Sequence, residues 1–274
     1  MSRLSIVIPA HNEAAVIGAC LDALAVSGEP GAEVEVIVVA NGCTDATVAE
    51  AEARRAAIEG RGWLLEVADI PTGGKIGALN VGDSIARGPL RAYLDADVTV
   101  SPTLLAETVA ALQGAAPAYA SGRVRIVGQG RVSRAYARFW SGVPFMAHSV
   151  PGCGYFAMNA AGRKRWTIWP DIIADDLFAR LNFAPSERIG LAAPYDWPIA
   201  EGFARLVRVR RRQDAGVAEL ARTHPDLLRN EDKGHSGNSL LGRILRDPLG
   251  FAVYVAVALA VRLRRQGNDW SRGR

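Results

Sequence analysis

Short, continuous apolar segments alternate with Ala-rich segments along the first 100 residues of the chain. The apolar segments are rich in Val and Ile, and unbroken runs of this kind are typical of strands buried on both faces of a sheet. Each run ends at a polar cluster, and a segment with the composition of a helix follows. The predicted strands are residues 4–8, 34–39, 63–67 and 91–94, and the predicted helices are residues 14–26, 46–58 and 76–87.

This alternation predicts an α/β fold, a Rossmann-like single domain. Strands joined by helices through short connections form a mostly parallel central sheet that is flanked by helices on both faces. The chain has 274 residues, enough for one large domain with a C-terminal helical appendage. Sheets of this kind bind ligands at the carboxyl ends of their strands, where the polar clusters of this chain lie.

The second half of the chain is less regular. Gly152 and Gly154 precede a short predicted strand and allow the backbone to approach a ligand closely. Arginines at helical spacing within residues 131–138 predict a solvated helix face. The remaining expected elements are helices at residues 102–113 and 132–140, a strand at 118–127, a helix that begins near Asp175, and a helical pattern from residue 199 to residue 216.

Residues 249–261 are apolar on all sides and are followed by several arginines. About 13 residues cannot span a bilayer core as a helix, which takes roughly 20. The segment is therefore a helix buried in the protein, or one that lies in a membrane interface with its arginines on anionic headgroups. A similar pattern in residues 240–246 favours contact with a membrane surface through residues 239–265. We also expect a mobile loop at 230–238 and a disordered tail after Gln266.

The composition is that of a globular protein, with 49% hydrophobic and 22% charged residues. The net charge of +4 comes mainly from arginine, which suits phosphate binding but equally reflects genomic composition. No nucleic acid partner is expected, and nothing indicates an oligomeric state. Cys20, Cys43 and Cys153 lack metal-ligand spacing, and the first residues lack a signal-peptide pattern, so we expect a reducing, cytoplasmic compartment.

Asp95 and Asp97 follow the fourth predicted strand at a spacing that points both carboxylates to one face. Two carboxylates this close repel each other unless a cation lies between them, and a divalent ion that also takes phosphate oxygens is the usual solution. The alternative is an ordinary loop, where Asp is common. The other strand ends carry hydrogen-bonding and charged side chains: Asn12, Glu13, Asn41, Asp45 and Lys75. Such a set suits a ligand with a base, a ribose and two phosphates.

Other motifs narrow the kind of site. No G-x-G-x-x-G follows the first strand, and Gly73-Gly-Lys75 lacks the leading Gly of a P-loop, so neither common nucleotide signature is present. Asp175 and Asp176 either favour a helix dipole or supply a base, since burial beside another acid raises a carboxyl pKa. The arginines at 210–212 either clamp a phosphate or form a surface patch.

Five motifs together resemble the inverting glycosyltransferases of family 2, which have the GT-A fold. They occur in the order and spacing of that family over residues 4–216: Ile6-Val-Ile-Pro-Ala-His-Asn-Glu13, Val38-Val-Ala-Asn-Gly-Cys-Thr-Asp45, Gly74-Lys-Ile-Gly-Ala-Leu-Asn80, Tyr93-Leu-Asp-Ala-Asp97 and Ala174-Asp-Asp-Leu177. The resemblance implies a GT-A domain at 1–216, with a nucleotide-sugar half at 1–100 and an acceptor half at 101–216. A helical extension at 217–274 would follow.

The resemblance also implies roles for individual residues. The nucleotide-diphosphate sugar would contact Pro9, Ala10, Asn12, Glu13, Asn41, Asp45, Lys75, Asp95, Ala96 and Arg212. Asp97, together with Asp95, would hold Mg²⁺ or Mn²⁺, which neutralises the departing diphosphate. Asp176, or else Asp175, would deprotonate an acceptor hydroxyl. The acceptor would contact Gly152, Cys153 and Gly154. This mechanism requires Asp97 and Asp176 to open into the same cavity.

Three departures from the family pattern limit what it implies. Ala40 and Asn41 stand where the family has two aspartates, so the nucleotide base is not implied. Asp175 replaces the usual Glu before Asp176, and Gln213 replaces a Trp of polymer-making relatives. We therefore expect transfer of a single sugar to a hydroxyl of a lipid-linked or cell-envelope glycan acceptor, on the inner face of the cell membrane.

Two other functions agree with the same residues. A nucleotidyltransferase also needs a nucleotide, a metal and carboxylates, although it ordinarily has a Gly-rich basic loop after the first strand. A nucleotide-sugar-binding protein docked on a membrane could keep the pocket without the chemistry.

Overall fold

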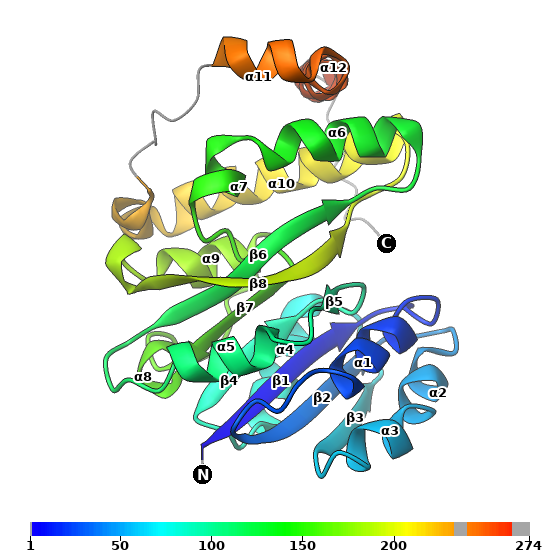
Figure 1. Cartoon of the computed structure of the whole chain (residues 1–274), viewed down its shortest axis with the longest axis vertical. Coiled ribbons are helices and arrows are strands. Elements are labelled where there is room, and N and C mark those ends of the chain that lie inside the picture. The colour runs from blue at the N-terminus through cyan, green and yellow to red at the C-terminus, as the bar shows by residue number, and fades with distance from the viewer. Residues whose placement is uncertain (1, 233–239, 265–274) are drawn as a thin grey trace.

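One eight-stranded sheet forms the centre of the computed structural model, which describes residues 2–232 and 240–264 (Figure 1). The strands lie in the order β3-β2-β1-β4-β7-β6-β8-β5. Their bounds are β1 (Arg3–Ala10), β2 (Glu33–Asn41), β3 (Leu64–Ile70), β4 (Leu90–Leu94), β5 (Thr99–Val100), β6 (Tyr119–Val127), β7 (Tyr155–Asn159) and β8 (Arg188–Pro198). The α/β prediction of a single, mostly parallel sheet is confirmed.

The strand directions place the site. β3, β2, β1 and β4 are mutually parallel, with Ala10 of β1 opposite Ala40 of β2, so their carboxyl ends meet at one rim. β7 runs antiparallel to both β4 and β6 and joins the two halves of the sheet. β6 and β8 are parallel, and the short β5 pairs antiparallel with β8.

Helices cover both faces of the sheet because side chains of each strand alternate between two cores. Ile6 packs into one core with Leu21 and Leu24, whereas its neighbour Val7 packs into the other with Leu79. The first core is closed by α1 (Ile17–Ala25), α2 (Thr47–Glu52), α3 (Arg55–Glu59) and α5 (Leu104–Ala111). The second is closed by α4 (Lys75–Ile85) and α9 (Asp175–Leu181). Short helices α8 (Ala160–Arg163), η1 (Pro185–Glu187) and η2 (Pro225–Asn230) lie in the connections.

Three elements differ from the expectations. The helix expected at 46–58 is two helices, α2 and α3, because the chain turns at 53–54, where Arg54 reaches Asp22 of α1 at 3.6 Å. The pattern at 188–198 predicted no strand, yet this segment is β8, and the helix expected from residue 199 begins only at Phe203. Proline normally disfavours the interior of a strand, but β8 contains Pro194 at a register shift opposite residues 121–123 of β6.

A third layer of helices lies beyond the β6–β8 edge (Figure 1). It consists of α6 (Arg131–Ser141), α7 (Pro144–His148), α10 (Phe203–Thr223), α11 (Leu240–Arg246) and α12 (Pro248–Arg264). Tyr136, Leu206 and Val257, from α6, α10 and α12, form its core. The arginines of α6 face solvent as expected, and Arg138 pairs with Asp247 at 3.1 Å. Helix α10 runs across the domain boundary expected at residue 216.

The C-terminal apolar segment is partly buried. Val257 and Val261 of α12 are buried against α6 and α10, while Leu249 and Leu263 are exposed. Among the described residues, no single helix is long and apolar enough to cross a membrane, although α11 and α12, bent by 114°, pass that test as a pair. The loop expected at 230–238 lies mostly, and the tail after 266 wholly, outside the described residues.

Candidate active site

The loops after β1 and β2 are held together at the rim by side chains that the sequence motifs single out. Asn41 donates a hydrogen bond from Nδ2 to the carbonyl of Ala10 at 2.8 Å, and its Oδ1 accepts one from the backbone N–H of Gly74 at 2.9 Å. Asn12 Oδ1 accepts from the backbone N–H of Thr44 at 2.8 Å, and Asn12 has a positive φ of 56°. Pro9, Ala10, Asn12 and Asn41 therefore lie near one another at the rim.

Asp45 holds the loops after β1 and β2 together through hydrogen bonds. Its Oδ1 accepts a hydrogen bond from the backbone N–H of Thr47 at 3.0 Å, and its Oδ2 accepts one from the backbone N–H of Ala14 at 3.1 Å. The hydrogen bond from the Thr47 hydroxyl is the main cause that lowers the pKa of Asp45. Both carboxylate oxygens are engaged within the protein, so Asp45 positions the two loops around the rim.

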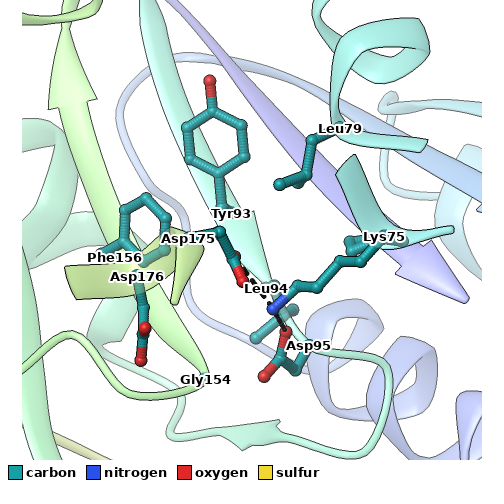
Figure 2. Close-up of a pocket in the computed structure, with 10 residues that line it drawn as sticks. Lys75, Leu79, Tyr93, Leu94, Asp95, Gly154, Phe156, Asp175 and Asp176 are labelled. Carbon is teal, nitrogen blue, oxygen red and sulfur yellow. Dashed lines mark ion pairs between the residues drawn. The ribbon is translucent and has the colours of Figure 1, made fainter. Parts of the chain in front are cut away.

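Lys75, at the start of α4, joins the two halves of the site. Figure 2 shows its ammonium between two carboxylates, with Nζ 2.9 Å from Oδ1 of Asp95 and 3.0 Å from Oδ2 of Asp175. Burial lowers the pKa of Lys75, but the charges of Asp175 and Asp95 outweigh burial and raise it. The lysine thus stays charged and connects the end of β4 to the start of α9.

Asp176 lies beside this pair on the first turn of α9 (Figure 2). One of its carboxylate oxygens accepts a hydrogen bond from the backbone N–H of Leu177 at 2.7 Å. Burial, followed by the charge of Asp175, raises the pKa of Asp176 to about 6. A half-buried carboxylate with this pKa is ionised at neutral pH and basic enough to accept a proton.

The space around these groups is small. A pocket of about 10 Å³ is bounded by ten residues: Pro9, Lys75, Leu79, Tyr93, Leu94, Asp95, Gly154, Phe156, Asp175 and Asp176. This volume holds about one water molecule. The Lys75 side chain and its two ion-pair partners occupy the space that a larger ligand would need.

Asp97 lines a different space, which corrects the expectation that it shares a cavity with Asp176. It opens into a cleft of about 420 Å³ together with Arg212 and Trp197. Asp97 lies in the cleft because β5 pairs antiparallel with β8, with Thr99 opposite Asp196. This pairing brings Asp97, two residues before Thr99, beside Trp197. Gly154 lies next to both spaces, since it lines the small pocket and a Cβ placed on it would be 2.7 Å from Cδ1 of Trp197, which lines the cleft.

The electrostatics of Asp97 favour a cation. Burial raises the pKa of Asp97 to about 7, and the carboxylates of Asp95 and Glu13 contribute. Burial, followed by the charges of Asp95 and Asp45, raises the pKa of Glu13 as well. Among the residues that the structure describes, no group of three His, Cys, Asp or Glu side chains is arranged to hold a metal ion. One or two carboxylates suffice for Mg²⁺ when substrate phosphates and water supply the other ligands.

The loop 152–154, predicted to contact the acceptor, supports the end of β4. The hydroxyl of Tyr195 donates a hydrogen bond to the carbonyl of Cys153 at 2.7 Å, and the backbone N–H of Asp95 donates one to the carbonyl of Gly154 at 2.9 Å. Gly152 and Gly154 have φ angles of 73° and 74°, which glycine adopts without strain. Gly154 alone of the three lines the small pocket.

The sequence motifs did not indicate several side chains of the site region. Trp140 and Trp197 line the cleft of Asp97, and no polar cluster stands next to either in the sequence to mark it. Behind the pocket, Asp83 accepts hydrogen bonds from Trp169 Nε1 at 2.8 Å and from Tyr93 Oη at 2.8 Å. Asp83 lies in the last turn of α4, where its sequence context resembles that of an ordinary surface residue.

Comparison with known proteins identifies the class of enzyme. The sequence matches the family described as "Glycosyl transferase family 2" over residues 5–169. Because this is more than half of the chain, the protein belongs to that family and is a glycosyltransferase. No curated protein sequence matched the chain.

Solved structures with a similar fold include those of a mannosyltransferase, of TarS and of glucosyl-3-phosphoglycerate synthase. The mannosyltransferase PcManGT from Pyrobaculum calidifontis, in complex with GDP-Man and Mn²⁺, has a TM-score of 0.60 and 20% sequence identity. The match covers 98% of this chain and 76% of the PcManGT chain. TarS 1–349 from S. aureus, in complex with UDP-GlcNAc, has a TM-score of 0.54 and 17% sequence identity, and the match covers 95% of this chain and 82% of the TarS chain. Glucosyl-3-phosphoglycerate synthase from Mycobacterium tuberculosis, in complex with Mn²⁺ and UDP-glucose, has a TM-score of 0.55 and 20% sequence identity. The match covers 85% of this chain and 81% of the synthase chain.

Proposed function

We propose that this glycosyltransferase moves a single sugar from a nucleotide-diphosphate sugar to a hydroxyl of a lipid-linked or cell-envelope glycan acceptor, with inversion. One observation carries the proposal. Lys75 forms ion pairs with Asp95, at the end of β4, and with Asp175, at the start of α9. The expected nucleotide-sugar half and the expected acceptor half of this family member therefore both contribute charged groups to one rim. The similar solved structures carry bound nucleotide sugars, which supports a donor of this class.

The nucleotide would bind at the ends of β1 and β2. Pro9, Ala10 and Asn12 lie there beside Asn41, whose amide already fixes the backbone of the rim. Lys75 would contact a phosphate oxygen, because its ammonium is the cation of the small pocket. Asp95 and Ala96 would lie near the ribose.

Asp97 would be the protein ligand of Mg²⁺ or Mn²⁺, with Asp95 near it and the donor phosphates completing the coordination. Such an ion acts as a Lewis acid that neutralises charge on the leaving diphosphate. Arg212 of α10 lines the same cleft as Asp97, where its guanidinium could contact an anionic group of a bound substrate.

Asp176 is the proposed base. Its carboxylate would accept the proton of the acceptor hydroxyl while that oxygen forms a bond to the anomeric carbon. The bond from the anomeric carbon to the phosphate oxygen breaks in the same step, and the bonding electrons leave with the nucleoside diphosphate. Attack from the face opposite the leaving group inverts the stereocentre. Asp175 is ion-paired to Lys75 at 3.0 Å and is therefore less available to accept a proton.

This mechanism requires the small pocket and the cleft to join when the donor binds. A donor phosphate would replace Asp175 as a partner of Lys75 and release the contact that closes the pocket. Gly154 lines the small pocket and lies close to Trp197 of the cleft. Joining them at this glycine would place the sugar between Asp97 and Asp176.

The test uses purified enzyme with candidate nucleotide sugars and acceptors. Asp97→Ala should abolish Mn²⁺-dependent release of nucleoside diphosphate. Asp176→Asn should lower turnover by about a hundredfold or more, as expected for loss of a base, while donor affinity is retained. Asp171→Asn, an exposed aspartate in the same segment, is the control and should keep full activity. Full activity in both site variants, or release of pyrophosphate in place of nucleoside diphosphate, would contradict the proposal.

We also propose that the enzyme works as a peripheral protein on the inner face of the cell membrane. Exposed leucines and arginines of α11 and α12 support this placement: Leu240, Leu241, Leu245, Leu249, Leu263, Arg246 and Arg262. Apolar side chains flanked by arginines suit the interface of a membrane with anionic lipids.

A further inference from the structure

The cleft beside Asp97 is far larger than the pocket around Lys75, and most of its wall is apolar. It lies between α6, the end of β8 and the middle of α10. The rings of Trp140 and Trp197 form one wall, with centroids 5.4 Å apart and an interplanar angle of 56°. Ile199, Leu206 and Val209 add aliphatic surface. The cleft therefore offers contact to an apolar group next to the proposed place of reaction.

Few polar groups line the cleft. Arg210 is committed within the protein, since it pairs with Asp214 at 3.0 Å and donates to the hydroxyl of Tyr254 at 3.3 Å. Arg212 is exposed and makes no ion pair with any residue in the described part of the chain. Its guanidinium is thus the cation of this cleft that is available to an anionic ligand.

We propose that the cleft binds the acceptor, and that the acceptor is an amphipathic molecule in which a phosphate joins an apolar chain to the sugar that carries the attacking hydroxyl. This inference rests on the proposed function and names its acceptor class. The sugar would lie at the Asp97 end, the phosphate on Arg212, and the first part of the chain against Trp140, Trp197 and Val209.

The chemistry of the walls distinguishes this ligand from simpler ones. A glycan without a lipid would bury hydroxyls against Leu206 and Val209, which form no hydrogen bonds, and that burial is unfavourable. A free phosphate would leave the aromatic wall in contact with water. An apolar chain with a phosphate at one end uses both the aliphatic surface and the free guanidinium.

Helix α12 connects this cleft to the exposed apolar surface. Tyr254 of α12 stacks on Tyr136 of the cleft wall with ring centroids 5.3 Å apart. The same helix exposes Leu259 and Leu263. A chain that leaves the cleft along α12 would pass into the lipid surface proposed for α11 and α12.

The experiment measures binding to the full-length protein by calorimetry, without a donor. Farnesyl phosphate, below its critical micelle concentration, is the probe, and farnesol and methyl phosphate represent its two parts. Wild-type protein should bind farnesyl phosphate at least tenfold more tightly than either part. Val209→Asp should raise the Kd for farnesyl phosphate about tenfold or more, because the added carboxylate repels the phosphate and wets the wall. Val217→Asp is the matched control and should leave this Kd unchanged, since Val217 is exposed on the same helix outside the cleft.

A second variant tests the anionic contact. Arg212→Gln should reduce the preference for farnesyl phosphate over farnesol, whereas Arg208→Gln, an exposed arginine one turn earlier, should not. Circular dichroism confirms folding, and Val209→Ser replaces Val209→Asp if that variant does not fold.

Other results would overturn the inference. It fails if wild-type protein does not bind farnesyl phosphate, if methyl phosphate binds as tightly, or if Val217→Asp weakens binding as much as Val209→Asp. Weakened binding of a soluble oligosaccharide by Val209→Asp, with farnesyl phosphate unaffected, would instead assign the cleft to a glycan. Thermal shifts with nucleoside diphosphates and Mn²⁺ test the donor site separately, so failure of the proposed function is recognised independently.

Discussion

The carboxylates of the rim differ in acidity because their surroundings differ. Asp45 is exposed and accepts hydrogen bonds from Thr47 and Ala14, so its pKa is lowered. Asp176 is half-buried next to Asp175, and burial together with the charge of Asp175 raises its pKa to about 6. One residue type therefore supplies a brace at one point and a proton acceptor at another, and the environment separates the two roles.

The raised pKa of Asp176 predicts a pH dependence. The base must be ionised to accept a proton, so kcat should be constant above about pH 7 and fall as the pH decreases through the pKa of about 6. Measurements at saturating donor and Mn²⁺ keep protonation of Asp97 from contributing, because bound cation competes with the proton there. A kcat that stays constant down to pH 4.5 would contradict the role of Asp176 as the base.

The identity of most site residues could be predicted from the sequence, but their partners could not. Asn12, Asn41, Lys75 and Asp95 follow predicted strands, and parallel strands bring their ends to one rim. The ion pair of Lys75 with Asp175 depends on how α9 packs on the sheet. Local sequence carries no information about such a long-range contact.

The loop before β7 depends on two glycines. A Cβ on Gly152 would lie 1.8 Å from the hydroxyl of Tyr119, and the φ of this residue is 73°. Gly152→Ala should therefore lower the free energy of unfolding by about 2–5 kcal/mol, from about 1–2 kcal/mol of backbone strain and about 1–3 kcal/mol of overpacking. Chemical denaturation measures this change.

Gly31→Ala is the matched control for that variant. Gly31 has nearly the same φ, 72°, but a Cβ there would meet nothing within 4 Å. Its cost should be the strain alone, about 1–2 kcal/mol. Equal costs for the two substitutions would show that the contact with Tyr119 relaxes freely.

Strand β8 shows where element prediction from local pattern fails. The segment 188–198 contains Pro194 and Pro198, which locally disfavour a strand. In the protein, residues 188–190 pair with residues 119–121 of β6, and pairing resumes beyond the shift at Pro194. Tertiary pairing overrides the local preference, and the consequence is functional, because β8 and β5 together place Asp97 beside Trp197.

Most of the strongly exposed leucines among the described residues lie on α11 and α12, in the helical layer farthest from β1–β3 (Figure 1). We expect the protein to sediment with vesicles that contain anionic phospholipid, and more weakly with zwitterionic vesicles. Leu245→Asp should reduce this binding several-fold because it places a charge in the apolar contact. Val26→Asp is the control, since both side chains are 74% exposed but Val26 lies at the end of α1. Equal binding of the two variants would exclude α11 as the contact.

The alternation of apolar strands and Ala-rich helices was sufficient to predict the α/β sheet and the rim at its strand ends, because these follow from local periodicity and from the geometry of parallel strands. The small pocket closed by Lys75 and the separate cleft of Asp97, Trp197 and Arg212 arise from packing between distant segments. Contacts across such distances depend on the shape of the folded chain, and no local pattern encodes them.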